Sequence, residues 1–380
     1  MPRQDSQVQD DDFFEGKRPW SVIKDEVLRT YLPVYLAKVQ RLNRRVLLVD
    51  GYAGPGRFGD GTDGSPLIML RAAEQRARGK YEALFINNER SYDAQLRATL
   101  APLEKWSGRV RPTFADSYTF LGEQAEHLAD FTVFLYLDPF GMKGCGFDIL
   151  LPYLTRDHRW STEIVLTMSM PILHRLAGRH AVQYGQVTPQ MASYHQTLTT
   201  ALGGDEWQGI MWDEARTAEE KEWAIMRHYH ARIQQYMPYG GFCPVRQSGD
   251  GSRIKYFMLF ASRHLDALEI MNDAMARAYF HRTHDAEFGG TLLRDLDWRE
   301  LRRSDGKLDD LPATIAELVA ASPGSTRNEL WLRLISTQFM RYTASEYLAE
   351  VKRLVRAGSL LATYGPTGRL NDVTRLRLPD

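Results

Sequence analysis

The stretch that most constrains how this chain can fold is residues 46–56, an apolar run followed by an acid and a glycine turn. Four consecutive apolar residues, 46–49, are typical of a short strand buried on both faces, as parallel strands are. Asp50 closes the strand, and the small-residue turn Gly54-Pro55-Gly56 follows. A helix can begin only at Ser65-Pro66, because serine suits the N-cap and proline the first helical position. Doubly wound α/β sheets use this order of strand, acid, glycine turn and helix to hold a nucleotide-like ligand.

The glycine turn also limits the kind of ligand. It is not GxGxxG, and no Walker Lys-Ser/Thr follows it, so the turn does not favour a phosphate cradle. A turn of this kind suits a nucleoside with an amino-acid tail, and we therefore expect S-adenosylmethionine (SAM). The alternative for the same stretch is a purely structural βα turn. The cofactor-binding residues predicted here are Asp50, Gly51, Tyr52, Ala53, Gly54 and Gly56.

Two further acids end the next predicted strands. Residues 81–87 predict a second strand that ends before Glu89, and an acid at this place hydrogen-bonds the two ribose hydroxyls in such folds. A weaker strand at 110–114 ends before Asp116, which could accept the adenine amine. The alternatives are a surface acid for Glu89 and a helix cap for Asp116.

The most informative later stretch is residues 131–141, a long apolar strand that ends in Asp138-Pro139-Phe140. Aromatic and β-branched residues are typical of a central strand. Methyltransferases that act on base amines carry Asp-Pro-Pro-Tyr or a near variant at the corresponding place. There the acid and a carbonyl accept hydrogen bonds from the amine, while the aromatic ring stacks on the base. We therefore predict Asp138, Pro139 and Phe140 as catalytic residues.

Composition limits the partners. Lysine and arginine balance aspartate and glutamate at 48 each, so a nucleic acid must be met by a local patch. The two cysteines, Cys145 and Cys243, lack metal-ligand spacing and point to a reducing cytoplasm. No metal is expected. No apolar run approaches the roughly 18 residues of a membrane span, and no membrane partner is expected.

The chain resembles a known family in five separated motifs. They are the 50–56 turn, Gly64–Ile68, Asn88-Glu89, Leu137–Gly141 and Tyr256–Ser262, with Trp20 and Lys24 matching the family's N-terminal helix. These motifs are similar to the three-Cys-motif partner (TcmP) family, over roughly residues 18–282. The resemblance implies a class I SAM-dependent methyltransferase-like domain, distantly similar to nucleic-acid amino-methyltransferases, and a three-cysteine partner protein. The second proline of the amino-methyltransferase signature is absent here.

Several charged residues have a plainer interpretation. Lys24 lies in a helix predicted from Trp20 to Arg41, and we interpret it as a solvated lysine. His174, Arg175, Arg179 and His180 follow a predicted fifth strand, and a solvated helix end is favoured over a phosphate contact. His281 and His284 lack a third ligand and predict no metal site.

The last seventy residues change character. Residues 311–380 predict three helices and a hairpin, with capping boxes at Thr326 and Thr343, which together indicate a winged helix. Its basic edge predicts nucleic-acid binding through Lys352, Arg353, Arg356, Arg369, Arg375 and Arg377. Winged helices also dock proteins, so a protein contact stays open.

The fold class predicted is therefore α/β: a Rossmann-like class I methyltransferase sheet with a helical insert, plus a small C-terminal winged-helix domain. The predicted parts are a disordered 1–17, a methyltransferase-like domain at 18–290 with an insert at about 171–240, a linker at 291–310 and the winged helix at 311–380. Two functions follow. One is a SAM-dependent methyltransferase acting on RNA or DNA, with a base amine favoured. The other is a non-catalytic or SAM-sensing module that serves a partner protein or a DNA site.

Overall fold

The computed structural model describes residues 19–101, 106–128, 130–178, 188–247, 252–288, 297–366 and 368–379. The predicted disordered segment 1–17 lies outside them. The chain divides into two compact units, 1–263 and 264–380. This boundary comes earlier than the predicted one at 290. The reason is that helix α11 (Leu265–Phe288) is tied to the second unit, where its Asn272 bonds the backbone of Met340 and Tyr342.

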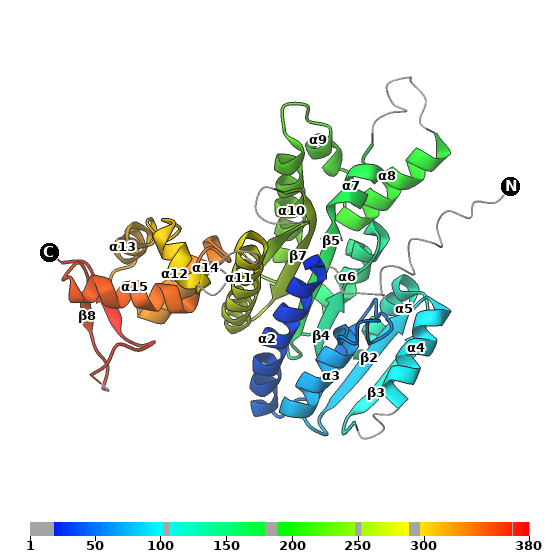
Figure 1. Cartoon of the computed structure of the whole chain (residues 1–380), viewed down its shortest axis with the longest axis horizontal. Helices are drawn as coiled ribbons and strands as arrows, with labels where there is room; N and C mark the ends of the chain where they lie inside the picture. Colours follow the sequence, from blue (N-terminus) through cyan, green and yellow to red (C-terminus); the bar gives the residue numbers. More distant parts are fainter. Residues whose placement is uncertain are drawn as a thin grey trace. The chain divides into compact units, whose positions relative to one another are not determined.

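The first unit is built on a seven-stranded sheet in the order β3-β2-β1-β4-β5-β7-β6 (Figure 1). All pairings are parallel except those of β7, which runs antiparallel to both β5 and β6. The predicted Rossmann-like fold class is thereby confirmed. The strands are β1 (Val46–Asp50), β2 (Tyr81–Asn87), β3 (Arg109–Phe114), β4 (Thr132–Leu137), β5 (Thr162–Ser169), β6 (Tyr239–Arg246) and β7 (Ile254–Ser262).

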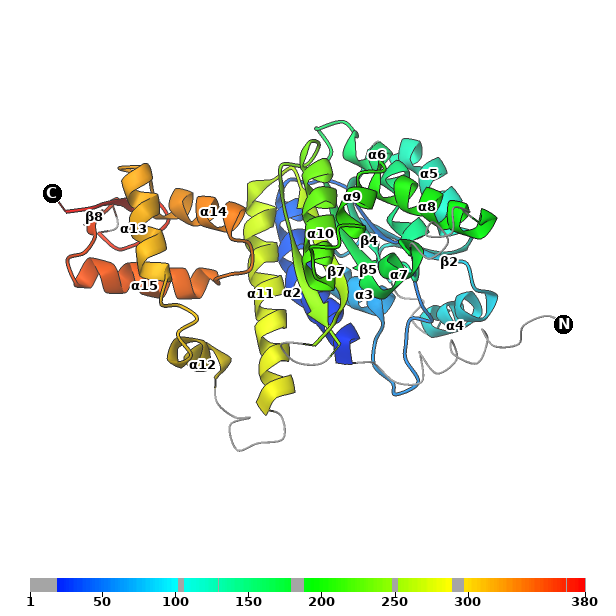
Figure 2. The same cartoon turned by 90° about the horizontal axis from the view of Figure 1, so that it is seen from above.

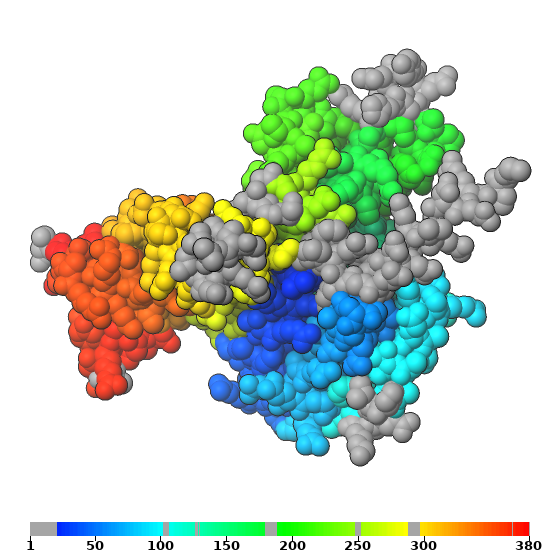
Figure 3. Space-filling view, in the orientation of Figure 1, coloured from blue at the N-terminus to red at the C-terminus, as the bar shows by residue number. Residues whose placement is uncertain are grey.

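Helices cover both faces of this sheet. This explains why β1 and β4 each contain only one residue, Asp50 and Thr132, that is not apolar or aromatic. Figure 2 shows α3 and α4 on one side of the sheet and α5 and α6 on the other. Helix α2 packs along α3, and the two lie side by side at the surface in Figure 3. The helices are α2 (Pro19–Arg41), α3 (Ser65–Arg76), α4 (Arg90–Leu100), α5 (Ser117–Gln124) and α6 (Phe147–Leu154), with short 3-10 helices η2 (Ala125–Leu128) and η3 (Met142–Cys145).

The predicted helical insert between β5 and β6 is present. It comprises α7 (Met170–Leu176), α8 (Pro189–Leu202), α9 (Trp207–Met211) and α10 (Ala218–Gln234). His174 pairs with Glu222 of α10 at 2.8 Å, so this member of the predicted basic cluster is held within the insert. Arg179 and His180 lie outside the described residues.

The second unit contains helices and one small hairpin. Its helices after α11 are α12 (Trp298–Ser304), α13 (Leu311–Ala321), α14 (Arg327–Thr337) and α15 (Ala344–Arg356), and its strands are β8 (Leu361–Thr363) and β9 (Arg375–Arg377). Both predicted capping boxes are found, at Thr326 and Thr343. The predicted linker contains α12, which is fixed by an ion pair of 2.8 Å between Arg302 and the buried Glu346. Three helices and an antiparallel hairpin are the elements expected of a winged helix.

Among the described residues, no helix is both long and apolar enough to cross a bilayer. None of their His, Cys, Asp and Glu side chains gather in threes in a way that could hold a metal ion.

Candidate functional site

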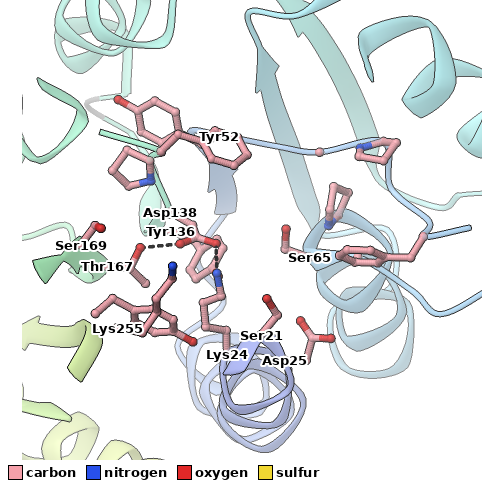
Figure 4. A pocket seen from close by; sticks show the side chains of 18 of the residues that line it. Ser21, Lys24, Asp25, Tyr52, Ser65, Tyr136, Asp138, Thr167, Ser169 and Lys255 are labelled. Carbon is pink, nitrogen blue, oxygen red and sulfur yellow. Dashed lines mark hydrogen bonds and ion pairs between the residues drawn. The ribbon is translucent and has the colours of Figure 1, made fainter. Parts of the chain in front are cut away.

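A cavity of about 320 Å³ opens at the carboxyl ends of β1, β4 and β5. Helix α2 supplies one wall, and the start of β7 supplies another, because antiparallel pairing places Tyr256 opposite Ser169 at the end of β5. Figure 4 shows the polar side chains that converge on this space. Those that line it include Ser21, Lys24, Asp25, Tyr52, Ser65, Tyr136, Asp138, Thr167, Ser169, Lys255 and Tyr256.

All three predicted catalytic residues, Asp138, Pro139 and Phe140, line the cavity. The Asp138 carboxylate is the centre of its polar network. Its Oδ2 forms an ion pair with Lys24, and its Oδ1 accepts a hydrogen bond from the Thr167 hydroxyl (Figure 4). Burial raises the pKa of the Tyr136 hydroxyl, and the nearby charge of Asp138 adds to that shift. Both oxygens of the acid therefore already have a protein partner.

The interpretation of Lys24 as a solvated lysine is wrong. Its side chain is only 12% exposed, and it reaches from α2 to Asp138. The sequence did contain a signal for this. Lys24 lies three, four and seven residues before Val27, Leu28 and Tyr31, which are all buried, so it belongs to the apolar stripe of the helix. A lysine within that stripe has to find a counter-charge.

Asp50 has a structural role in the loop that follows β1. It is fully buried and does not line the cavity. Its Oδ1 accepts from the Tyr52 backbone N–H at 3.1 Å, and its Oδ2 accepts from the Ser65 hydroxyl at 2.6 Å. Burial raises its pKa to about 7, while these two hydrogen bonds act in the opposite direction. Asp50 thus joins the two ends of the loop between β1 and α3.

The other turn residues divide into two groups. Tyr52, Gly54 and Gly56 line the cavity. Gly51 and Ala53 do not line it, and their backbone N–H groups bond the carbonyls of Tyr136 and Ile86, at 2.9 and 2.8 Å. These two bonds anchor the loop to the neighbouring strands. Asp50, Gly51 and Ala53 therefore support the loop, and their contacts with a cofactor stay a prediction.

Gly56 is constrained by the protein itself. Its φ is +82°, a conformation that favours glycine, and a Cβ there would lie 2.8 Å from Cδ1 of Leu96 on α4. Packing against α4 therefore requires the absence of a side chain at this position.

Glu89 and Asp116 lie at the carboxyl ends of β2 and β3 but outside the cavity. Each is the N-cap of the helix that follows. Glu89 Oε1 accepts from the N–H and hydroxyl of Ser91, and Asp116 Oδ1 accepts from those of Thr119. The capping alternative for Asp116 is thus what the structure shows. These bonds lower the pKa of Asp116. Among the described residues, the second oxygen of each carboxylate accepts no hydrogen bond.

Two buried polar atoms near the same edge of the sheet have no partner among the described residues: the Tyr52 hydroxyl and the side-chain nitrogen of Asn87. An unpaired buried donor costs about 1–3 kcal/mol. Burial raises the pKa of the Tyr52 hydroxyl, so it stays protonated. The polar requirements of this edge are therefore not met by the described residues alone.

The predicted basic edge of the second unit is partly neutralised. Arg353 donates to both oxygens of Glu350, at 2.6–3.0 Å, and this contact raises its pKa. Arg375 donates to the carbonyl of Gly324 at 2.5 Å. Lys352, Arg356 and Arg377 are exposed. Leu376, between Arg375 and Arg377, is buried, as expected where side chains alternate between the two faces of a strand.

No family model matches the chain, and no curated protein matches it. Among solved structures it is similar to a candidate methyltransferase, yhhF, from Escherichia coli, at 19% identity over 42% of this chain and 72% of that one, with a TM-score of 0.24. It is similar to a candidate caffeoyl-CoA O-methyltransferase from Staphylococcus aureus at 9% identity, over 60% and 81% of the two chains, with a TM-score of 0.28.

A third similar structure is geranyl diphosphate C-methyltransferase from Streptomyces coelicolor, which contains S-adenosyl-L-homocysteine. Its identity is 10%, over 61% of this chain and 75% of that one, and the TM-score is 0.24. The identities and TM-scores are low, so the fold class rests on the strand order of the sheet and not on these similarities.

Proposed function

We propose that the protein is a SAM-dependent methyltransferase that acts on a nucleic acid. The observation that carries the proposal is the cavity at the carboxyl ends of β1, β4 and β5, with a glycine turn on one side and the Lys24–Asp138 pair on the other. Open α/β sheets bind ligands at this edge.

The described residues fit the cofactor. Glu89 and Asp116 each keep one carboxylate oxygen for a donor, which suits the ribose hydroxyls and the adenine amine of SAM. The loop that contains Tyr52, Gly54 and Gly56 follows β1 and lines the cavity. In the sheet, β1 lies between β2, which precedes Glu89, and β4, which precedes Asp138. SAM supplies a methyl group on a sulfonium, which leaves readily to a nucleophile, so the protein's contribution is to position the acceptor.

The acceptor side is formed by Asp138 and Phe140. The Phe140 ring is 60% exposed at the rim of the cavity, which suits stacking on a planar base. The basic residues of the second unit provide phosphate contacts in this proposal. A base amine as acceptor is less well supported than the sequence suggested, because both oxygens of Asp138 already have a partner, Lys24 and Thr167.

The test begins with titration calorimetry of the full chain with SAM. Glu89→Ser keeps a good N-cap for α4 but removes the carboxylate, and we expect SAM to bind about 10- to 100-fold more weakly. Asp297→Ser makes the same exchange at the cap of α12 in the second unit and should leave SAM affinity unchanged. If the wild-type chain binds no SAM, the proposal is wrong.

One observation favours the second function, a SAM-sensing module that serves a partner such as a three-cysteine protein. The Asp138 carboxylate is already occupied by its ion pair with Lys24. Under this alternative SAM binds, but no labelled methyl group reaches cellular RNA or DNA.

A further inference from the structure

Lys24 places an amine in the lining of the cavity, and the proposed function assigns this amine no part in proton transfer. Its Nζ pairs with Asp138 and lies 5.0 Å from the centre of the Tyr256 ring. An amine nitrogen in its neutral form has one lone pair and two N–H donors. One donor satisfies Asp138, which leaves the lone pair to accept a proton.

The surroundings of Asp138 separate two kinds of acceptor group. Both oxygens of the ionised Asp138 carboxylate already have a partner, Lys24 on Oδ2 and the Thr167 hydroxyl on Oδ1. A base amine needs oxygen acceptors for its two N–H groups, and the carboxylate offers it little room. A hydroxyl needs the opposite, a base that removes its proton, because it is a weak nucleophile until it is deprotonated.

We infer that Lys24 is the proton acceptor for a hydroxyl, and that this hydroxyl is the ribose 2′-OH of RNA. This inference rests on the proposed methyltransferase function. The transfer forms a bond between the ribose oxygen and the methyl carbon and breaks the bond between that carbon and sulfur. The electron pair stays on sulfur, and the hydroxyl proton moves to Nζ of Lys24. Asp138 then stabilises the ammonium that results.

RNA is favoured as the polymer by the rest of the cavity lining. The cavity lining includes three cationic side chains, Lys24, Arg57 and Lys255, and two carboxylates, Asp25 and Asp138, while Arg57 also pairs with Asp63 at 3.5 Å. Cationic side chains suit contacts with phosphates. Phe140 offers a ring to an unstacked base, as single-stranded RNA presents it. The 2′-hydroxyl is the group by which a protein distinguishes RNA from DNA.

The protonation of Lys24 depends on the groups that face it. These are Asp138 and Tyr136 on β4, buried Asp50 on β1, Tyr256 and Lys255 on β7, and Asp25 on its own helix. Because the reaction needs the neutral amine, we expect turnover at saturating SAM to rise about tenfold per pH unit until a plateau is reached.

The product test uses total RNA from cells that lack this protein, incubated with the full chain and methyl-labelled SAM. Alkali cleaves RNA at every residue with a free 2′-hydroxyl, so a 2′-O-methyl group survives in an alkali-resistant dinucleotide. We expect the label there and none on DNA. Label in mononucleotides, on a base, would overturn the inference while leaving the methyltransferase proposal intact. SAM binding with no label in RNA would also overturn it. Absence of SAM binding would remove the proposed function itself.

The residue test compares two replacements of Lys24. Lys24→Met removes the amine, and Lys24→Arg keeps the positive charge but cannot lose a proton in a protein. We expect both to lower turnover at least ~100-fold at every pH, with SAM affinity and melting temperature retained. Lys80→Met, at an exposed lysine outside the cavity, is the matched control and should behave as wild type. An active Lys24→Arg with an unchanged pH profile would show that only the charge matters and would overturn the assignment.

Discussion

The ion pair between Lys24 and Asp138 joins the helix before the first strand to the end of β4, across 114 positions of sequence. It fixes the Asp138 carboxylate, which the sequence motif predicts as catalytic. It also brings to the cavity the amine of Lys24, which the sequence pattern was interpreted to leave solvated. This contact ties α2 to the chemistry of the sheet's carboxyl edge.

Asp138→Asn tests whether the acid acts in chemistry or in cofactor binding. The amide keeps the size of the side chain but cannot balance the charge of Lys24. We expect turnover to fall at least ~100-fold, the scale on which positioning residues act, with SAM affinity retained. Labelled-methyl transfer and calorimetry measure the two quantities separately. Lost SAM affinity with normal turnover at saturation would make Asp138 a cofactor residue instead.

Gly56 and Gly61 form a matched pair in the loop between β1 and α3. Both have a positive φ, at +82° and +84°, but a Cβ at Gly61 meets nothing within 4 Å, while one at Gly56 approaches Leu96 at 2.8 Å. Gly61→Ala should cost about 1 kcal/mol of unfolding free energy for the backbone alone. Gly56→Ala should cost about 2–4 kcal/mol, because overpacking adds to it. Urea unfolding compares them. Equal losses would mean that α4 yields to the added methyl.

The strands and the glycine turn could be predicted because apolar runs, acids and glycines lie close together in sequence. Even Asp138 was recognisable from the motif around it. The role of Asp50 was not, because burial and a hydroxyl from Ser65, 15 positions away, decide it. The attachment of α11 to the second unit could not be predicted for a similar reason: it depends on bonds of Asn272 with Met340 and Tyr342 and on a bond from Ala344 to Asp273, all between residues far apart in sequence.

Asp50 makes the stability of the fold depend on pH. Its folded pKa of about 7 lies above the ordinary aspartate value of 3.8, so the native state binds the proton more tightly than the unfolded state does. The contribution is therefore fully present below about pH 4 and is lost as the pH rises to about 7. Asp50→Asn removes this titration. We expect the variant to gain stability relative to wild type by about 2–4 kcal/mol between pH 4.5 and pH 8.

Urea unfolding of both proteins across this pH range gives the difference directly. Glu163, whose pKa burial also raises to about 7, is present in both proteins and cancels. A constant difference would show that Asp50 is ionised throughout.

The last prediction concerns Glu350, which neutralises Arg353 on α15. If the second unit holds nucleic acid through its basic edge, Glu350→Gln should release the Arg353 guanidinium for a phosphate. Binding of the full chain to a duplex should then tighten, and the log–log slope of affinity against salt should steepen by about 0.9 for the added phosphate contact. Arg353→Ala combined with Arg377→Ala should flatten the slope and weaken binding to every sequence alike. Glu317→Gln, at an acid on α13, is the control for a general change in net charge. A basic edge that contacts phosphates must release counterions, so its binding must depend on salt. If neither the wild-type chain nor Glu350→Gln shows salt-dependent binding to the duplex, the nucleic-acid prediction is wrong. The three helices and hairpin then dock a protein.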